Sequence, residues 1–248
     1  MIRRHEMIQS PELERHVHVW CYGHWGAPVV AFPTAAGMAH EWERQGMVEA
    51  LRPLIDGGRI KLYCPESNVA EAWTRRETDP RWRIQRHQRY EHFVLATLAP
   101  AIRRDCGGNM ALPLAVVGAS LGGFYAANFA LKAPETFTYA LCLSGRYEMT
   151  HFTGGFNNLD VYFNNPLAYV ANLSGESLAR VQQNAHLTLV CGRGKWEEGC
   201  FEETHALADA LTHKGISHYR DIWGTDVSHD WPWWQRQARY HLGMRFGD

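Results

Sequence analysis

The sequence has almost no charge bias, since 25 Lys and Arg stand against 26 Asp and Glu in 248 residues. Nucleic-acid binding rests on many Lys and Arg contacts to phosphate, so this balance argues against DNA or RNA as a partner. The longest apolar run, residues 111–119, reaches only about half the length of a membrane helix. No apolar stretch follows the charged first residues. We therefore expect no signal peptide, no membrane partner and a cytoplasmic location.

Cysteine is present without the spacing of a metal site or a disulfide framework. The six cysteines stand at positions 21, 64, 106, 142, 191 and 200, and none forms a Cys-x2-Cys pair. We therefore expect no metal and no cofactor. Several cysteines lie in apolar runs, as in Leu141-Cys142-Leu143, which favours free buried thiols in a reducing compartment.

No repeat, low-complexity segment or linker divides the chain, so we expect one domain over residues 1–248. Short apolar runs predict strands at residues 16–22, 28–32, 60–64, 112–117, 138–144, 186–191 and 218–223. Amphipathic runs predict helices at residues 41–55, 86–104, 122–132, 201–213 and 232–242. This alternation predicts a three-layer α/β fold, with a mostly parallel central sheet, helices on both faces and no large cap domain.

Two local features refine that fold. Only residues 23–27 separate the first two predicted strands, which indicates an antiparallel hairpin. Residues 148–171 are rich in Gly, Asn, Phe and Tyr without a clear period. We expect them to form an excursion over the edge of the sheet, where substrate contacts often lie.

The most specific motif is the pentapeptide Gly118-Ala119-Ser120-Leu121-Gly122. It follows an apolar predicted strand and precedes a small-residue predicted helix, which is the context of a nucleophile elbow. Only small residues fit two positions before and after a serine on so sharp a turn. Ser120 is therefore our candidate nucleophile.

A serine hydroxyl needs a base, and the sequence offers 14 histidines. In an elbow-type hydrolase the base follows the acid, which follows the serine. His229 alone occupies a short polar loop after the last predicted strand and before the last predicted helix. We therefore choose His229, with Pro232 in the first turn of that helix.

The acid that orients the histidine should lie in the loop after residues 186–191. That loop contains the adjacent Glu197 and Glu198, of which we favour Glu197 and keep Glu198 as the alternative. Asp226 could reach His229 locally, but its place in the chain does not fit. The Gly192-x-Gly194 string lacks the rest of a phosphate loop.

The remaining site predictions concern the oxyanion and the substrate. The N–H of Leu121 is one expected oxyanion donor, and the loop after residues 28–32 should supply the other. Ala35 is our first choice there, with Thr34 or Ala36 as alternatives, because proline at position 33 has no N–H. Trp231 and Phe152 are candidate substrate contacts, although plain core packing explains Trp231 equally well.

In these three motifs (the elbow, residues 191–198 and residues 228–234) the chain resembles the α/β-hydrolase superfamily. Within it, the chain resembles the putative-esterase group, which includes esterase D-like proteins and the antigen 85 type of mycolyltransferase. The resemblance implies a serine nucleophile, an acid after the penultimate strand and a histidine before the last helix. One departure concerns the oxyanion loop, where Phe32-Pro33-Thr34-Ala35 replaces the His-Gly pair of many relatives.

We therefore expect a serine hydrolase that cleaves a small-molecule carboxylic ester through an acyl-enzyme on Ser120. An acyltransferase with the same triad is the first alternative, because an acceptor alcohol can replace water. A catalytically silent hydrolase fold that serves as a binding module is the second. The sequence is compatible with a homo-oligomer.

Overall fold

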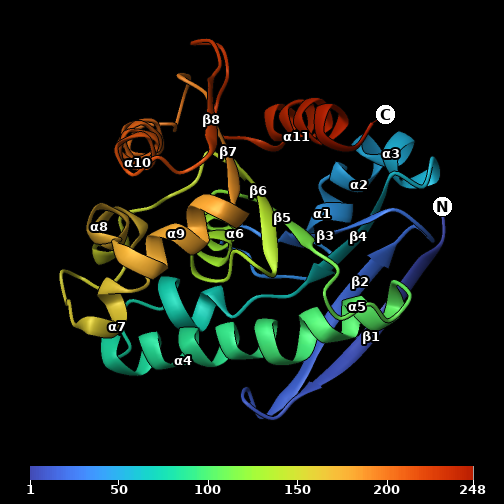
Figure 1. The fold of residues 1–248 in the computed structure, drawn as a ribbon, viewed down its shortest axis with the longest axis horizontal. Helices are drawn as coiled ribbons and strands as arrows, with labels where there is room; N and C mark the ends of the chain where they lie inside the picture. Colours follow the sequence, from blue (N-terminus) through green and yellow to red (C-terminus); the bar gives the residue numbers. More distant parts are fainter. Residues whose placement is uncertain (248) are drawn as a thin grey trace.

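The computed structural model describes residues 1–247 as one eight-stranded sheet with helices on both faces (Figure 1). The strand order is β1-β2-β4-β3-β5-β6-β7-β8. The β1–β2 and β2–β4 pairs are antiparallel, and the other pairs are parallel. The strands are β1 (Arg3–Ser10), β2 (Arg15–Tyr22), β3 (Ala27–Phe32), β4 (Ile60–Pro65), β5 (Leu114–Ala119), β6 (Phe137–Leu143), β7 (His186–Cys191) and β8 (His218–Ile222).

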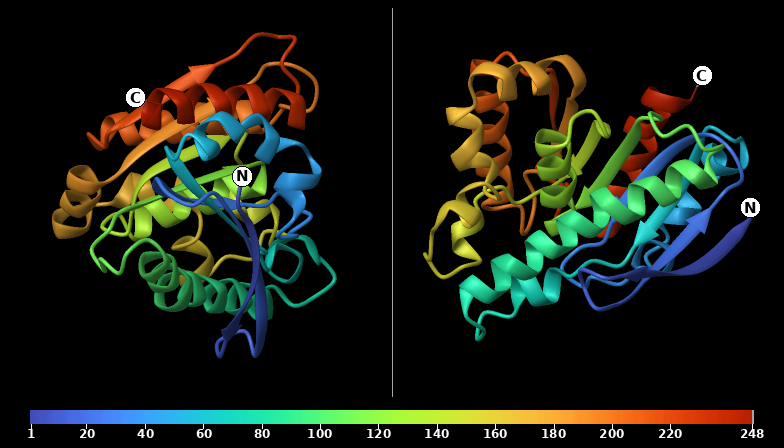
Figure 2. Two further views of the ribbon diagram at one scale, coloured as in Figure 1. Left: turned by 90° about the vertical axis from the view of Figure 1, so that its right-hand side faces the viewer. Right: turned by 60° about the horizontal axis from the view of Figure 1, so that its bottom comes forward.

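The helices divide into two layers, one on each face of the sheet. The first layer includes α4 (Pro80–Phe93), the π-helical η2 (Val94–Leu98), α5 (Ala99–Asp105), α6 (Leu121–Lys132), α9 (Gly175–Asn184) and α10 (Cys200–His213). The second includes α1 (Glu41–Arg44), α2 (Met47–Ala50), α3 (Arg52–Asp56) and α11 (Trp231–Phe246). Figure 2 shows α4, η2 and α5 as one nearly continuous rod along the sheet. The predicted three-layer α/β fold, with a mostly parallel sheet and helices on both faces, is confirmed.

The central strands are apolar throughout because both faces are covered. In β3, Val30 and Phe32 pack into the core with α4 and α6, whereas Val29 and Ala31 pack against the α11 layer. Burial of such strands on both faces supplies the main stabilising contribution of the sheet. The sheet therefore gives a rigid frame for the loops at the carboxyl ends of its strands.

The predicted hairpin between the first two strands is wrong. β2 pairs with β1 and β4, and β4 separates it from β3. The turn between β2 and β3 crosses the start of β4 through Gly26, which has a φ of 111°. A Cβ atom there would lie 2.5 Å from the backbone nitrogen of Ile60, so only glycine allows this crossing.

Other boundaries also differ from the predictions. β1 was not predicted, because most of its residues are exposed and apolar side chains do not alternate along it. The helix predicted at residues 41–55 is three short helices, and the first break falls at Gly46, whose φ is 72°. The helix predicted at residues 86–104 begins earlier, at Pro80, with Asp79 as its cap.

Residues 148–171 form the expected excursion, with four short helical pieces. These are the 3-10 helix η3 (Met149–His151), α7 (Leu159–Tyr162), α8 (Pro166–Tyr169) and the 3-10 helix η4 (Val170–Asn172). A π-helical turn, η1 (Ala70–Thr74), lies before α4. Among residues 1–247, no helix is both long enough and apolar enough to cross a bilayer. In the same residues the six cysteines are unpaired, as predicted.

Candidate active site

Ser120 lies on a strained turn between β5 and α6. Its φ of 56° and ψ of −123° fall outside the regions that L-residues ordinarily occupy. A Cβ atom at Gly118 would lie 2.1 Å from the carbonyl oxygen of Gly122, and one at Gly122 would lie 2.6 Å from that of Phe32. Both glycines are therefore required for this turn. They let three stretches of backbone pack closely around a partly exposed serine.

His229 and Glu197 meet across two neighbouring loops. Glu197 lies between β7 and α10, and His229 lies between β8 and α11. Nδ1 of His229 is 3.2 Å from Oε2 of Glu197, whose residue is 1% exposed. Glu198 is exposed to solvent. The structure thus brings Glu197, rather than Glu198, to the histidine.

Two glycines hold the loop that contains Glu197 (the acid loop, residues 192–199) against the loop that contains His229 (the histidine loop, residues 223–230). Gly194 N–H donates to the carbonyl of Val227 over 2.8 Å, and His229 N–H donates to that of Lys195 over 3.0 Å. A Cβ atom at Gly192 would lie 2.1 Å from the Val227 oxygen, and one at Gly194 would lie 2.6 Å from it. The Gly-x-Gly string therefore has a structural reason: the two loops run backbone against backbone.

Glu197 accepts hydrogen bonds from several buried groups. Ser144 Oγ donates to Oε1 over 2.6 Å, and the N–H of Gly192 donates to the same oxygen over 3.3 Å. Cys191 Sγ donates to Oε2 over 3.4 Å. Burial alone would raise the pKa of Glu197, but the hydrogen bonds from His229 and Ser144 outweigh it and lower the pKa. The carboxylate is therefore held in its ionised form.

Ser144 is a site residue that the sequence analysis missed. It follows β6, is fully buried and has a φ of 46°. Its hydroxyl also accepts a hydrogen bond of 3.1 Å from Nε1 of Trp234, and the Trp234 ring lies 4.8 Å from the His229 ring in an edge-on contact. One hydroxyl thus links Glu197 to the indole that packs on His229. The only sequence signal was a polar residue at the end of an apolar strand.

The structure of residues 1–247 contains no hydrogen bond between Ser120 and His229. The backbone connects their surroundings instead, because Ser120 N–H donates to the carbonyl of Leu143, directly before Ser144. Glu197 occupies Nδ1 of His229, so Nε2 is the imidazole nitrogen left for a reacting group.

The predicted oxyanion loop is fixed by a buried glutamate. Glu41 is 4% exposed and accepts from both the N–H and the Oγ1 of Thr34, each over 2.7 Å. Burial raises the pKa of Glu41, and these two hydrogen bonds only partly offset it. The Thr34 N–H is therefore occupied. Within residues 1–247, the N–H of the exposed Ala35 has no hydrogen-bond acceptor.

The two predicted substrate contacts lie in different surroundings. Trp231 is half-buried and packs edge-on against Trp234 and Trp42, with ring centres 5.3 and 6.5 Å away. Phe152 is half-buried against the core on the α4 and α6 face, and its carbonyl accepts a hydrogen bond from Arg83. Trp234, rather than Trp231, is the tryptophan in contact with the ring of His229.

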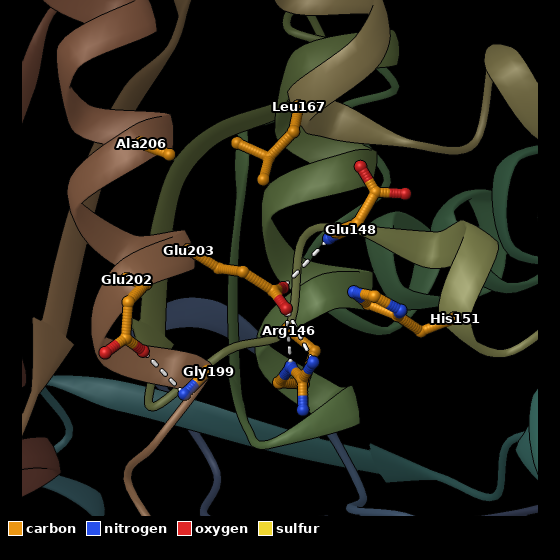
Figure 3. Close-up of a pocket in the computed structure, with 8 residues that line it drawn as sticks. All are labelled: Arg146, Glu148, His151, Leu167, Gly199, Glu202, Glu203 and Ala206. Atoms are coloured by element: carbon orange, nitrogen blue, oxygen red, sulfur yellow. Dashed lines mark hydrogen bonds and ion pairs between the residues drawn. The ribbon is translucent and has the colours of Figure 1, made fainter.

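A cavity of about 500 Å³ lies beside the acid loop (Figure 3). It is lined by Arg146, Glu148, His151, Leu167, Gly199, Glu202, Glu203 and Ala206. Figure 3 shows Arg146 and Glu203 pointing toward each other, and their ion pair is 2.6 Å long. Glu203 also accepts from the backbone N–H groups of Tyr147 and Glu148, so it fixes the segment that follows β6.

Comparisons with known proteins agree with this architecture. A family model described as "Putative esterase" matches residues 62–242. No curated protein matches the chain. Among solved structures, an S-formylglutathione hydrolase from Agrobacterium tumefaciens is similar with a TM-score of 0.75 and 15% identity, over 99% of this chain and 94% of that one. The Mycobacterium tuberculosis protein MPT51 is similar with a TM-score of 0.74 and 17% identity, over 100% and 98%.

A ferulic acid esterase is similar over 99% of this chain and 97% of its own, with a TM-score of 0.74 and 16% identity. At such identities the structural likeness shows the α/β-hydrolase fold alone. The family model is more specific, because it spans well over half of the chain, from β4 to α11. The chain belongs to the putative esterase family.

Proposed function

We propose that this protein is a serine esterase in which Ser120, His229 and Glu197 form the catalytic triad. The observation that carries the proposal is the bond between Nδ1 of His229 and the buried, ionised Glu197, in a fold with Ser120 on a strained turn. Strain of this kind persists where the surrounding structure imposes it, often at functional sites. The family match supports ester hydrolysis as the reaction.

In the proposed reaction, Ser120 Oγ attacks the ester carbonyl carbon while its proton moves to Nε2 of His229. The tetrahedral intermediate then collapses, and the leaving alcohol takes that proton. Water attacks the acyl-enzyme, gives one proton to His229 and releases the carboxylic acid as Ser120 recovers its proton. Glu197 keeps the Nδ1–H tautomer of His229 and stabilises the imidazolium that forms twice in each cycle.

The developing oxyanion needs two donors. The N–H of Leu121 is one, because it directly follows Ser120 at the start of α6, where N–H groups lack intrahelical acceptors. We assign the other to Ala35, because Glu41 already binds the N–H of Thr34. Glu41 acts as a positioning residue, since its two hydrogen bonds fix the loop that presents Ala35.

A fluorophosphonate probe and a short-chain nitrophenyl ester test the triad. Ser120→Ala should abolish labelling and lower kcat by about 10⁴-fold or more, with an unchanged circular dichroism spectrum. Ser174→Ala is the matched control, because Ser174 is exposed and its side chain makes no cap hydrogen bond. Full hydrolysis by the Ser120 variant would overturn the proposal.

The two adjacent glutamates give a second matched pair. Glu197→Gln should lose most activity because it no longer stabilises the imidazolium, whereas Glu198→Gln should retain it. Product analysis with an added alcohol separates hydrolysis from acyl transfer. A folded protein that neither takes up the probe nor cleaves esters would instead be a binding module on a hydrolase fold.

A further inference from the structure

A third side chain of a type that can bind metals lies beside Glu197 and His229. Cys200 is the first residue of α10, and its Sγ is 3.8 Å from Nδ1 of His229. The donor atoms of Glu197, Cys200 and His229 all lie within 4.8 Å of one another. The proposed reaction makes no use of the Cys200 thiol.

These distances suit one small cation. Zinc binds imidazole nitrogen at about 2.0–2.1 Å, carboxylate oxygen at about 2.0–2.2 Å and thiolate sulfur at about 2.3 Å. Tetrahedral angles then separate two such donor atoms by about 3.4–3.6 Å. The nitrogen–oxygen and nitrogen–sulfur distances here, 3.2 and 3.8 Å, lie within a few tenths of an ångström of that value.

We propose that Glu197, Cys200 and His229 form an inhibitory site for a thiophilic divalent cation such as Zn²⁺. The three side chains supply oxygen, sulfur and nitrogen, and a water molecule completes the tetrahedron. Glu197 and Cys200 are almost fully buried, whereas the His229 side chain is 19% exposed, so the cation enters along the imidazole.

Cation binding blocks the base by changing its tautomer. The thiol of Cys200 releases its proton to the buffer and binds as thiolate. Nδ1 of His229 gives its lone pair to the cation, so the single imidazole proton moves to Nε2. The nitrogen that would accept the Ser120 proton is then already protonated, and the carboxylate no longer accepts a hydrogen bond from the ring. This consequence for activity rests on the proposed triad, whereas the binding does not.

Cobalt gives a readout that is independent of catalysis. Full-length protein, freed of metal with EDTA, is titrated with Co²⁺ while the thiolate-to-cobalt absorption band in the near ultraviolet is followed. We expect one equivalent to produce the band and Zn²⁺ to abolish it by displacement. Ser120→Ala protein should bind equally well, which separates this inference from the proposed nucleophile.

Cys200→Ser should remove the band and weaken Zn²⁺ binding by about 100-fold or more, because a thiolate ligand is lost. Cys106→Ser is the matched control, since Cys106 is more accessible and contacts Tyr63 instead. His229→Gln gives a second test should the Cys200 variant not fold. Zn²⁺ should inhibit wild-type ester hydrolysis over the concentrations at which it displaces Co²⁺, and EDTA should reverse the inhibition. An absent thiolate band, or equal binding by folded Cys200→Ser protein, would overturn the inference.

Discussion

Removal of the Ser144 hydroxyl should damage both stability and catalysis. The hydroxyl donates to Glu197 over 2.6 Å and accepts from Trp234 over 3.1 Å, and all three side chains are buried. A hydrogen bond to a charged group contributes about 1.5–3 kcal/mol, and an unsatisfied buried N–H costs about 1–3 kcal/mol. Because one hydroxyl makes both bonds, the two values are not simply additive. We expect Ser144→Ala to lose about 3 kcal/mol of unfolding free energy.

Catalysis should fall for the same reason. The Ser144 hydrogen bond helps to lower the pKa of Glu197. Its loss therefore raises that pKa and weakens the hydrogen bond between Glu197 and His229. If Ser144→Ala loses about 1.4 kcal/mol of transition-state stabilisation, its kcat/KM falls about tenfold. The deficit should be larger at pH 5 than at pH 8, because more of the variant's Glu197 is protonated there.

Two further variants separate the hydroxyl from the backbone. An L-residue in the left-handed region costs about 1–2 kcal/mol, so Ser144→Gly should be about 1 kcal/mol more stable than Ser144→Ala. Both should be equally impaired in catalysis, because neither has the hydroxyl. Trp234→Phe removes the indole N–H together with part of the ring that packs on His229, and it leaves the bond between Ser144 and Glu197. Urea unfolding followed by circular dichroism gives the stabilities. Wild-type kcat/KM in either Ser144 variant would refute the reasoning.

Three other predictions concern the stability of the fold. Burial raises the pKa of Glu41, so wild-type protein loses stability as pH rises through that pKa. In Glu41→Gln, the amide oxygen accepts from the Thr34 N–H and the amide NH2 donates to Thr34 Oγ1, so the melting temperature of the variant relative to wild type should increase between pH 4 and pH 8. Burial alone would raise the pKa of Asp105, but hydrogen bonds from Lys61, Tyr63 and Arg4 to its carboxylate lower the pKa from 3.8 to about 2. Because solvent screens this exposed carboxylate, Asp105→Asn should cost only about 1 kcal/mol at pH 7 and much less at pH 2, as measured by urea unfolding at the two pH values. Gly122→Ala should abolish activity or folding, because its Cβ would lie 2.6 Å from a backbone oxygen, whereas Gly243→Ala in open helical surroundings should stabilise by about 1 kcal/mol in thermal unfolding.

The sequence could predict the parts of the site that depend on local pattern and chain order. The elbow at Ser120 needs a strand, a small-residue turn and a helix, and all three are local. The histidine could be chosen because its loop lies between the last strand and the last helix. The sequence favoured Glu197 but left Glu198 open, because neighbouring side chains point in different directions and only the fold shows which one is buried.

The parts that failed depend on contacts between distant segments. Ser144 and Cys200 look like ordinary polar or apolar positions, and only the packing of β6, α10 and α11 brings them to the acid and the base. The false hairpin has a similar cause. A short glycine-containing turn usually joins paired strands, but here Gly26 lets the chain pass β4.

The close approach of backbone to backbone at four glycines determines which positions around the site can be substituted. Gly118 and Gly122 hold the elbow, and Gly192 and Gly194 hold the acid loop against the histidine loop. A contact between main-chain atoms does not depend on the identity of the neighbouring side chains, so those side chains can be substituted without loss of the contact. The framework of this site thus depends on a few glycine positions, which carry no side chain. The shape of the site frame therefore depends on main-chain packing, which is compatible with a fold shared by solved structures of only 15–17% identity.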